Sequence, residues 1–386
     1  ERGMSLKDKA AIIGVGCSQF AENWTQSAED MIVDAAFEAY ADAGIEDANR
    51  QIDAIYCGSL YSPTGPVDVS EALKLYKPLT AVYNYCATGT EVVRAACMAI
   101  AAGVYDTVLC VGYDKPKDRG VSGPSVVTDR VRDLPQTPAG WFSLAAATYF
   151  EKYGASRADL AKIAIKNHAN GCLAEKSFLK RKITEDDYFK ARIISWPFGL
   201  YDSAAQTDGA AAAILTRTDL ASRYTKEPIK IKGVTVRAGP NPQKDPKNDF
   251  LSWKPTAWAR DDVYQMAGVT DARKQIGIAQ VHDCFSLTEL LTYEDLGFCA
   301  KGSAKEHIAS GDFELSGSLP VNTDGGLKTF GHPTGATGVR MIYENVMQLR
   351  GKAGARQVRG VEGKLAVSHN IGGHPTACGI AVIGRD

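Results

Sequence analysis

The sequence predicts an α/β fold in which strands and helices alternate along most of the chain. Short apolar runs typical of buried strands are separated by segments whose apolar residues repeat with helical spacing. The order of these elements recurs, and Ala-Thr-Gly precedes a helical segment in each half, at 87–89 and at 336–338. The 386 residues are 45% hydrophobic, enough for a large core in two or three domain-sized units. We expect a parallel sheet covered by helices on both faces.

The first predicted half covers residues 4–225. Its expected strands are 10–16, 54–57, 107–113 and 209–216, with a helix over 28–43 and a short β-like run at 81–83. An insertion over 114–206, opening with lysines, prolines and glycines, interrupts this half and has helical patterns at 141–153 and 157–169. We expect the insertion to form a lid on the sheet domain.

The second predicted half, residues 226–386, repeats the plan. Its expected strands are 229–236, 278–281, 365–368 and 379–383, and its expected helices are 258–267, 286–297 and one that ends at Leu349. Duplicated α/β halves place their ligand site where the two sets of strand ends meet. We therefore look for chemistry in the turns that follow the strands.

Charge and cysteine content narrow the classes of function. The 44 Lys and Arg nearly balance the 45 Asp and Glu, so no net field favours nucleic acid or an anionic membrane. No apolar run reaches the ~18 to 20 residues needed to span a bilayer, and no secretory signal precedes Met4. The nine cysteines form no CxxC pair, which argues against a disulfide framework or a zinc knuckle. These features predict a reducing, cytoplasmic compartment.

Cys86 is the first candidate catalytic residue. It stands between a β-like run and a segment with helical spacing, so its sulfur is expected near the free N–H groups of a helix start. The positive end of the helix dipole favours thiolate, which predicts a lowered pKa and a nucleophilic sulfur. The alternative is a buried structural cysteine, because free cysteines are often buried at such positions.

Three further segments at strand-end turns carry reactive side chains. His332 lies in GHPTGATG, His282 and Cys284 lie in HDCF, and Gly373 ends HNIGG. A single histidine is more often a hydrogen-bonded structural residue than a base. Together, however, these segments supply a nucleophile, a base, a second thiol and backbone donors, a complete set for acyl transfer.

The segments YCATG, HDCF, NTDGG, GHPTGATG and HNIGG, in this order, resemble the thiolase superfamily, and HDCF with HN resembles its sterol-carrier-protein-2 type. The resemblance covers essentially the whole chain. It implies a five-layered α/β/α/β/α fold of two similar halves with an inserted loop domain. It also implies coenzyme A thioesters as substrates, coenzyme A itself as substrate or product, and no metal in this chain.

The resemblance also implies a role for each residue. Cys86 would carry the acyl group, and His332 would withdraw its proton. Cys284 would protonate the leaving carbanion and deprotonate incoming coenzyme A. His282 and His332 would hold the enolate oxygen, and the N–H groups of Cys86 and Gly373 would form the oxyanion hole.

The sequence departs from the commonest thiolases at its end. Those enzymes carry the second catalytic cysteine in a glycine-rich C-terminal stretch, whereas Cys378 lies beyond the glycines and is expected to be structural. The second thiol is therefore assigned to Cys284. Ketoacyl synthases pair their cysteine with two histidines and lack this thiol, so a decarboxylating condensation is not expected.

Two other functions stay open. Members of this branch that cleave steroid side chains are retro-aldol lyases without the nucleophilic cysteine, and Tyr293 or Tyr343 would then be the acid or base. A non-catalytic scaffold subunit is the third reading. The presence of Cys86, Cys284 and His332 together favours the thiolase, because a lyase needs no acyl-cysteine.

Substrate and partners are expectations from the same resemblance. The acyl group is aromatic, steroid or short aliphatic, and the benzoylsuccinyl-CoA thiolase belongs to this branch. Aromatic residues of the insertion would line an aryl pocket or pack in the core: Trp141, Phe142, Trp196 and Phe198. Basic residues would meet the coenzyme A phosphates: Lys115, Lys117, Arg119, Lys180, Arg181 and Lys182. We expect a homodimer through the thiolase core and a small zinc-containing OB-fold partner of the DUF35 type.

Overall fold

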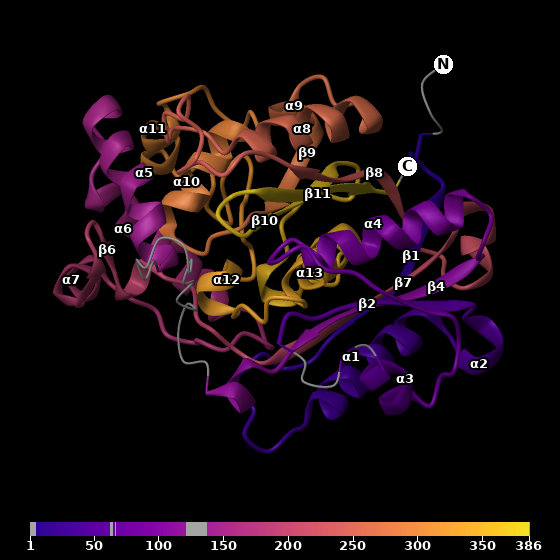
Figure 1. The fold of residues 1–386 in the computed structure, drawn as a ribbon. Coiled ribbons are helices and arrows are strands. Elements are labelled where there is room, and N and C mark those ends of the chain that lie inside the picture. The colour runs from indigo at the N-terminus through magenta and orange to yellow at the C-terminus, as the bar shows by residue number, and fades with distance from the viewer. Residues whose placement is uncertain (1–4, 62–64, 66, 121–136, 386) are drawn as a thin grey trace.

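The computed structural model describes residues 5–61, 65, 67–120 and 137–385, which fold into alternating layers of helices and sheet (Figure 1). The large sheet has the strand order β3-β2-β4-β7-β1-β8-β11-β10-β9. Its strands are β1 (Ala10–Cys17), β2 (Ala54–Gly58), β3 (Leu79–Ala81), β4 (Thr107–Asp114), β7 (Gly209–Arg217), β8 (Ile229–Ala238), β9 (Ile276–Gln280), β10 (Leu365–Gly372) and β11 (Ala377–Gly384). A separate hairpin joins β5 (Ile193–Ser195) and β6 (Phe198–Gly199).

The strands of the two halves lie in two layers that meet where β1 pairs briefly with β8. Helix α1 (Ala28–Ala43) covers the outer face of the first layer, and α8 (Lys254–Ala267) covers the outer face of the second. Helices α4 (Thr88–Ala101) and α13 (Thr337–Leu349) lie between the layers. This α/β/α/β/α arrangement confirms the predicted fold class.

The remaining helices are short or lie at the edges of these layers. They are α2 (Ala48–Gln51), α3 (Val67–Leu73), α5 (Pro138–Tyr153), α6 (Arg157–Gly171), α7 (Glu185–Lys190), α9 (Ala272–Gln275), α10 (Ser286–Asp295), α11 (Ala304–Ala309) and α12 (Gly326–Thr329). None of the helices within the described ranges combines the length and apolar character needed to cross a membrane.

The prediction of a parallel sheet is wrong for much of the molecule. Among the strands of the described residues that form the large sheet, the pairs β2–β3, β2–β4 and β9–β10 are parallel, and the other pairs are antiparallel. The connection from Gly372 to Ala377 is too short for a crossover, so β10 and β11 must run in opposite directions. The expected run at 81–83 is also displaced, since β3 ends at Ala81.

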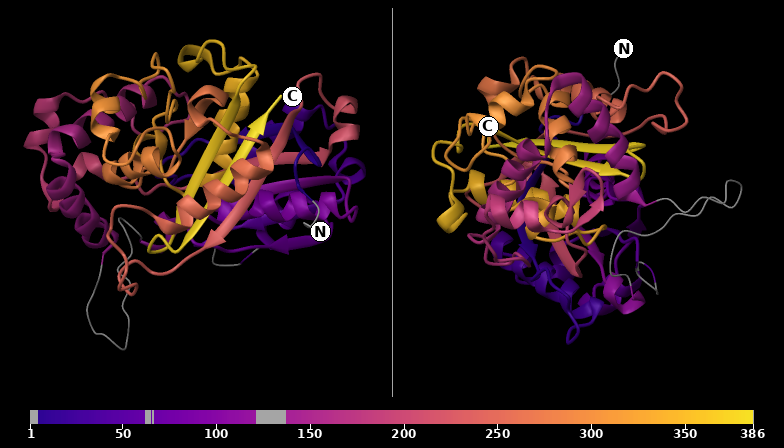
Figure 2. Two further views of the ribbon diagram at one scale, coloured as in Figure 1. Left: turned by 90° about the horizontal axis from the view of Figure 1, so that it is seen from above. Right: turned by 90° about the vertical axis from the view of Figure 1, so that its left-hand side faces the viewer.

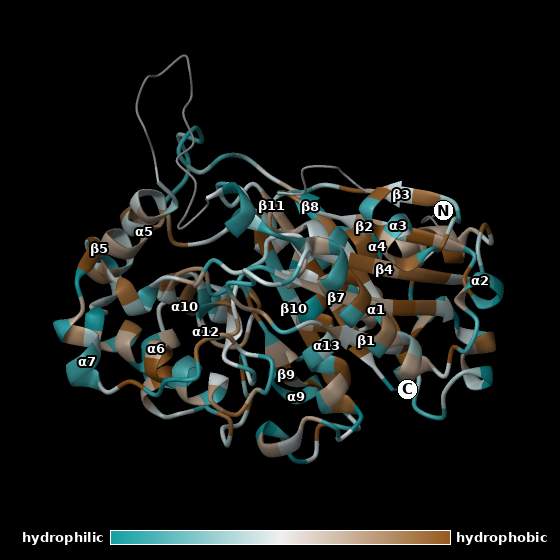
Figure 3. Cartoon of the chain, turned by 90° about the horizontal axis from the view of Figure 1, so that it is seen from below, coloured by the Kyte–Doolittle hydropathy of each residue, from teal (hydrophilic) through white to brown (hydrophobic). Residues whose placement is uncertain are grey.

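Sequence features set the packing of α1 on β1. All eight residues of β1 are buried, as a continuous apolar run predicts. Ser27 and Asp30 form a capping box at the start of α1, and Gly44 ends the helix in the left-handed conformation. A Cβ on Gly16 would lie 2.0 Å from the carbonyl oxygen of Ala35, so the glycine lets strand and helix approach closely. Figure 3 shows how hydrophobic the strands of this half are.

The insertion packs beside the C-terminal half, where α5 and α6 lie next to α10 (Figure 2). Lys166 of α6 forms a fully buried ion pair with Glu289 of α10, with Nζ and Oε1 2.5 Å apart. Asn167 donates to Asp283 over 2.9 Å. The insertion therefore shares a core with the second half and is more than a lid on the first. The limits predicted for the halves and the insertion stay predictions.

Candidate active site

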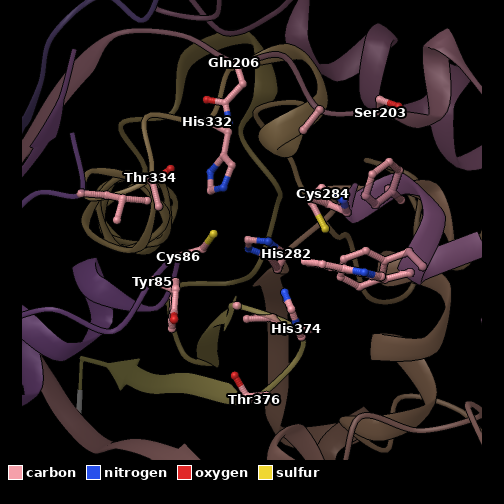
Figure 4. A pocket seen from close by; sticks show the side chains of 18 of the residues that line it. Tyr85, Cys86, Ser203, Gln206, His282, Cys284, His332, Thr334, His374 and Thr376 are labelled. Carbon is pink, nitrogen blue, oxygen red and sulfur yellow. The ribbon is translucent and has the colours of Figure 1, made fainter. Parts of the chain in front are cut away.

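One cavity of about 460 Å³ collects the candidate residues from both halves (Figure 4). Cys86 comes from the turn between β3 and α4, and Cys284 and His282 come from the segment between β9 and α10. His332 lies between α12 and α13, and Gly373 directly follows β10. The sulfur of Cys86 and one ring nitrogen from each of His282 and His332 all lie within 4.8 Å of one another. The predicted segments therefore converge, although His332 follows a helix and not a strand.

The turn before α4 holds Cys86 in the cavity. Tyr85 adopts a positive φ of 49°, and the N–H of Asn84 donates to Thr88 Oγ1 over 2.9 Å. Burial, and after it nearby Cys284 and Asp114, raise the pKa of the Cys86 thiol to about 12, although the N–H groups of Gly373 and Cys86 act in the opposite direction. The expectation of a lowered pKa is wrong here, because loss of hydration outweighs the helix start. The thiol is neutral and needs a base.

His332 has the properties of that base. Thr337 Oγ1 donates to the carbonyl of Pro333 over 3.0 Å, so it accepts the Nδ1 proton of His332 over 2.7 Å. Nε2 is then left with a free lone pair. Burial and, to a smaller extent, Arg340 lower the pKa of His332 to about 3, so the ring is neutral. In Figure 4 this ring points from above toward the sulfur of Cys86.

The hydrogen bond at Nδ1 of His282 runs in the opposite direction to the one at Nδ1 of His332. The Asn370 amide donates to its Nδ1 over 3.1 Å, which leaves the ring proton on Nε2. Burial, then His332 and His369, lower its pKa well below the ordinary value. The His282 and His332 rings meet edge to face with centroids 5.3 Å apart. The cavity is therefore lined by a neutral hydrogen-bond acceptor, His332, and a neutral hydrogen-bond donor, His282.

Cys284 lies on the far side of His282 from Cys86 (Figure 4). Its sulfur is 3.4 Å from Thr288 Oγ1, one turn along α10. Burial raises the pKa of this thiol to about 12, so it carries a proton that it can donate. Cys378, by contrast, is fully buried in the core and contacts Thr256 Oγ1, as expected of a structural cysteine. All nine cysteines are free.

The sequence alone assigns no catalytic or positioning role to Asn370 or His369. Asn370 orients His282, and His369 accepts the backbone N–H of His282 at Nδ1 over 3.4 Å. The signal was present, because the two residues stand together in the HN pair. Sequence analysis also missed His374, whose Nδ1 lies 3.2 Å from Asn241 Nδ2 on the cavity wall.

The cavity wall is largely apolar. Its aromatic residues are Tyr61, Tyr85, Trp141, Phe142 and Phe285. Trp141 packs against His374, and Phe142 packs against Phe285. The other two aromatic residues proposed for the pocket lie elsewhere, since Trp196 is 62% exposed and Phe198 is stacked on Phe285 in the core.

The basic residues expected at the phosphates do not gather here. Lys115 is buried and donates to Asn23 O over 2.7 Å and to Asp118, and Lys117 is buried and paired with Glu22 at 2.6 Å. Both charges are therefore already neutralised. Among the described residues that line the cavity, none of the six predicted basic residues occurs. Arg181 is paired with Asp187, Lys180 donates to a carbonyl, and Arg119 and Lys182 are exposed, so these four stay predictions.

Tyr293 and Tyr343, the acid or base of the lyase alternative, also lie away from the cavity. Tyr293 is fully buried against Glu289, and Tyr343 of α13 has its hydroxyl 3.4 Å from Glu38 of α1. Neither tyrosine is among the described residues that line the cavity.

Known proteins resemble this chain in sequence and in fold. A profile described as Thiolase C-terminal domain-like matches residues 242–385. An acetyl-CoA acetyltransferase of Methanothermobacter thermautotrophicus is 33% identical, over 97% of this chain and 99% of that protein. Sterol carrier protein 2 of Gallus gallus is 30% identical, over 95% of this chain and 70% of that protein. The benzoylsuccinyl-CoA thiolase subunit BbsB of Thauera aromatica is 27% identical, over 96% of each chain.

A solved structure of the Ltp2-ChsH2(DUF35) aldolase matches with a TM-score of 0.85 and 25% identity, over 99% of both chains. Human mitochondrial 3-ketoacyl-CoA thiolase in complex with CoA has the same fold, with a TM-score of 0.74 at 18% identity, over all of both chains. The acetyltransferase matches over nearly the whole chain, and both the five-layered fold and the convergence of the cysteine and histidine segments are consistent with that match. This chain belongs to the thiolase family of acyltransferases.

Proposed function

We propose that this enzyme cleaves a 3-oxoacyl-CoA with coenzyme A, through an acyl group carried on Cys86. The observation that carries the proposal is the convergence of two neutral thiols, Cys86 and Cys284, with a neutral acceptor, His332, and a neutral donor, His282. Each of these groups has a part in the reaction: Cys86 as nucleophile, His332 as its base, Cys284 as the acid and base at C2 and coenzyme A, and His282 as hydrogen-bond donor to the enolate.

In the first half-reaction, Cys86 gives its proton to Nε2 of His332, and its sulfur attacks the 3-keto carbon. The N–H groups of Cys86 and Gly373 stabilise the tetrahedral oxyanion, and loss of one such donor typically costs ~3 to 4 kcal/mol of barrier. The bond between C2 and C3 breaks, and its electron pair moves into the enolate held by Nε2–H of His282. Cys284 then protonates C2, and the CoA ester that holds C1 and C2 leaves, while the shortened acyl group stays on Cys86.

In the second half-reaction, the Cys284 thiolate takes the proton of incoming coenzyme A. The coenzyme A sulfur attacks the acyl-Cys86 thioester, and the departing Cys86 sulfur recovers its proton from His332. Both thiols and both rings return to their starting states, so the cycle balances.

We also propose that the acyl group is aromatic or similarly bulky and apolar. The aromatic residues on the cavity wall favour such a group, and Trp141 supplies a flat surface for it. The name of the Thauera aromatica relative, a benzoylsuccinyl-CoA thiolase subunit, supports the same class. Steroid and short aliphatic acyl groups remain alternatives for the assay described below.

Because Lys115 and Lys117 are buried and paired, other residues are needed to bind the coenzyme A phosphates. Lys244 and Lys247 are exposed on the loop after β8, which also carries the cavity residue Asn241. We propose that these lysines contact the coenzyme A phosphates, together with any of the four remaining insertion residues. Such surface contacts should weaken as salt rises. If Lys244→Glu with Lys247→Glu leaves coenzyme A binding unchanged at low salt, this placement is wrong.

The proposed partners are a second copy of this chain and a DUF35 protein. The edge strand β3 borders a cluster of exposed large side chains, namely Tyr76, Tyr83, Tyr85 and Met98. An unpaired strand edge with apolar neighbours is suited to pairing between two copies. The names Ltp2-ChsH2(DUF35) aldolase and subunit BbsB support a second, different subunit. Light scattering of Tyr83→Glu against the unmodified chain tests the homodimer.

A retro-aldol lyase is the second candidate, since the Ltp2-ChsH2(DUF35) aldolase has the same fold. One set of assays separates the functions: cleavage of 3-oxoacyl-CoA and 3-hydroxyacyl-CoA esters with aryl, steroid and short acyl groups, each with and without coenzyme A and with and without the DUF35 partner. The thiolase predicts coenzyme-A-dependent cleavage that Cys86→Ser abolishes. The lyase predicts cleavage of a 3-hydroxyacyl-CoA to a free carbonyl product without coenzyme A, unaffected by Cys86→Ser. A non-catalytic scaffold subunit shows neither activity, with or without the DUF35 partner.

A further inference from the structure

The three side chains closest to the reacting atoms also form a set of metal ligands. The Cys86 sulfur and one ring nitrogen from each of His282 and His332 lie within 4.8 Å of one another. In a tetrahedral zinc site, bond lengths of ~2.0 to 2.3 Å put neighbouring donor atoms roughly 3.3 to 3.8 Å apart. Small side-chain rotations would close the set around one ion.

The surroundings of the two rings suit this role. Thr337 contacts Nδ1 of His332, and Asn370 contacts Nδ1 of His282, so each ring keeps Nε2 for the cavity. A metal-bound histidine donates the N–H of its second nitrogen to an acceptor, as Nδ1 of His332 does to Thr337.

One change is needed at His282. Its Nε2 carries the ring proton, because the Asn370 amide donates to Nδ1. Asn370 Oδ1 is buried and has no hydrogen-bond partner. Rotating this amide by half a turn would present Oδ1 to Nδ1, so the proton would move to Nδ1 and Nε2 would become a ligand. The unpartnered oxygen thus provides what the metal-bound form needs.

We propose that Cys86, His282 and His332 bind one zinc ion, with the fourth position open to water from the cavity, and that the bound ion blocks the enzyme. The S–H bond of Cys86 gives way to a sulfur–zinc bond, and its proton passes to the buffer. The ion occupies the nucleophile, the base and the enolate donor at once. Zinc bound at this site inhibits the enzyme, whichever acyl group the substrate carries.

Titration of the metal-free full-length chain with zinc chloride, followed by calorimetry, tests the proposal without any substrate. We expect one site per chain, release of one proton, and protection of Cys86 from iodoacetamide. Cobalt(II) should bind the same site and give a thiolate charge-transfer band. Cys86→Ala and His332→Ala should each weaken binding more than about 100-fold, whereas Cys172→Ala, at a half-buried thiol outside the cavity, should not change it.

Asn370→Asp provides a second test that does not remove a ligand. A carboxylate accepts from Nδ1 of His282 and so stabilises the ligand form of the ring, which should tighten zinc binding about 10-fold while turnover falls. Circular dichroism checks that each variant folds. The proposal is overturned if one-to-one binding survives Cys86→Ala, if cobalt gives no thiolate band, or if Cys86 stays open to alkylation at saturating zinc. These outcomes leave the thiolase assignment unaffected, because no substrate is present.

Discussion

Gly89 and Gly338 pack backbone against backbone at the starts of α4 and α13. A Cβ on Gly89 would lie 2.7 Å from the backbone nitrogen of Gly338, and a Cβ on Gly338 would lie 2.5 Å from that of Thr90. Each glycine closes an Ala-Thr-Gly segment, so the two halves meet at corresponding positions. Cys86 shortly precedes one glycine and His332 the other, and the contact brings nucleophile and base together.

Gly89→Ala should therefore damage both stability and catalysis. The added methyl group meets backbone that cannot move aside, and overpacking of this kind typically costs ~1 to 3 kcal/mol. We expect urea denaturation to show a loss in this range, and we expect turnover to fall further than the folded fraction does. Gly363→Ala is the matched control, because a Cβ there meets nothing within 4 Å. Equal behaviour of the two variants would contradict the importance of this contact.

Cys284→Ala should separate acylation from carbon–carbon bond cleavage. Cys86 should still be acylated by an activated thioester, since that step does not use the second thiol. Thiolysis should fall by ~10²- to 10⁴-fold, the usual contribution of a general acid or base. Stopped-flow acylation and steady-state thiolysis, with Cys172→Ala as control, provide the measurement. Near-normal thiolysis would mean that another group transfers the proton.

Trp141→Ala should change the acyl preference. Trp141 lines the cavity and packs on His374, so its removal takes away a flat apolar surface. We expect KM to rise at least about 5-fold for aryl 3-oxoacyl-CoA esters, from the loss of ~1 kcal/mol of aromatic contact. Acetoacetyl-CoA should be affected much less. Equal changes for both substrates would argue against an aryl site at this wall.

Acid should destabilise the fold through its buried histidines. Burial lowers the pKa of His369 to about 3, well below its unfolded value of ~6.5. Below ~6.5 the unfolded chain takes up a proton that the folded chain refuses, so stability is lost as pH falls toward 3. The loss is at most ~1.4 kcal/mol per pH unit for this residue. His369→Gln should show a shallower fall in unfolding free energy between pH 8 and 5. Parallel curves for the two proteins would contradict this account.

The sequence predicted most of the elements and pointed to the candidate residues that line the cavity, because both depend on local pattern. The apolar run at 107–113 and the helical spacing at 28–43 specify β4 and α1 directly. Cys86 stands in a turn between a strand and a helix, as the local pattern predicts, whereas His332 is marked by its GHPTGATG segment and lies between α12 and α13. The HDCF segment likewise provides His282 and Cys284 without long-range information.

Features that depend on distant partners were not predictable in this way. Lys115 looked like a surface cation, but Asp208 and Asn23 from other strands and loops bury it and satisfy it. The raised pKa of Cys86 follows from burial by segments far along the chain, which outweighs the local helix start. Strand direction also depends on the connections, so an alternating pattern alone suggested too many parallel pairs.

The most direct test of the central claim is mass spectrometry of the chain after incubation with a substrate 3-oxoacyl-CoA and no free coenzyme A. We expect an acyl adduct on the peptide that contains Cys86, its removal by added coenzyme A, and its absence in Cys86→Ser. A confirmed substrate that is turned over with no adduct, or with an adduct only on another cysteine, would contradict acyl transfer through Cys86.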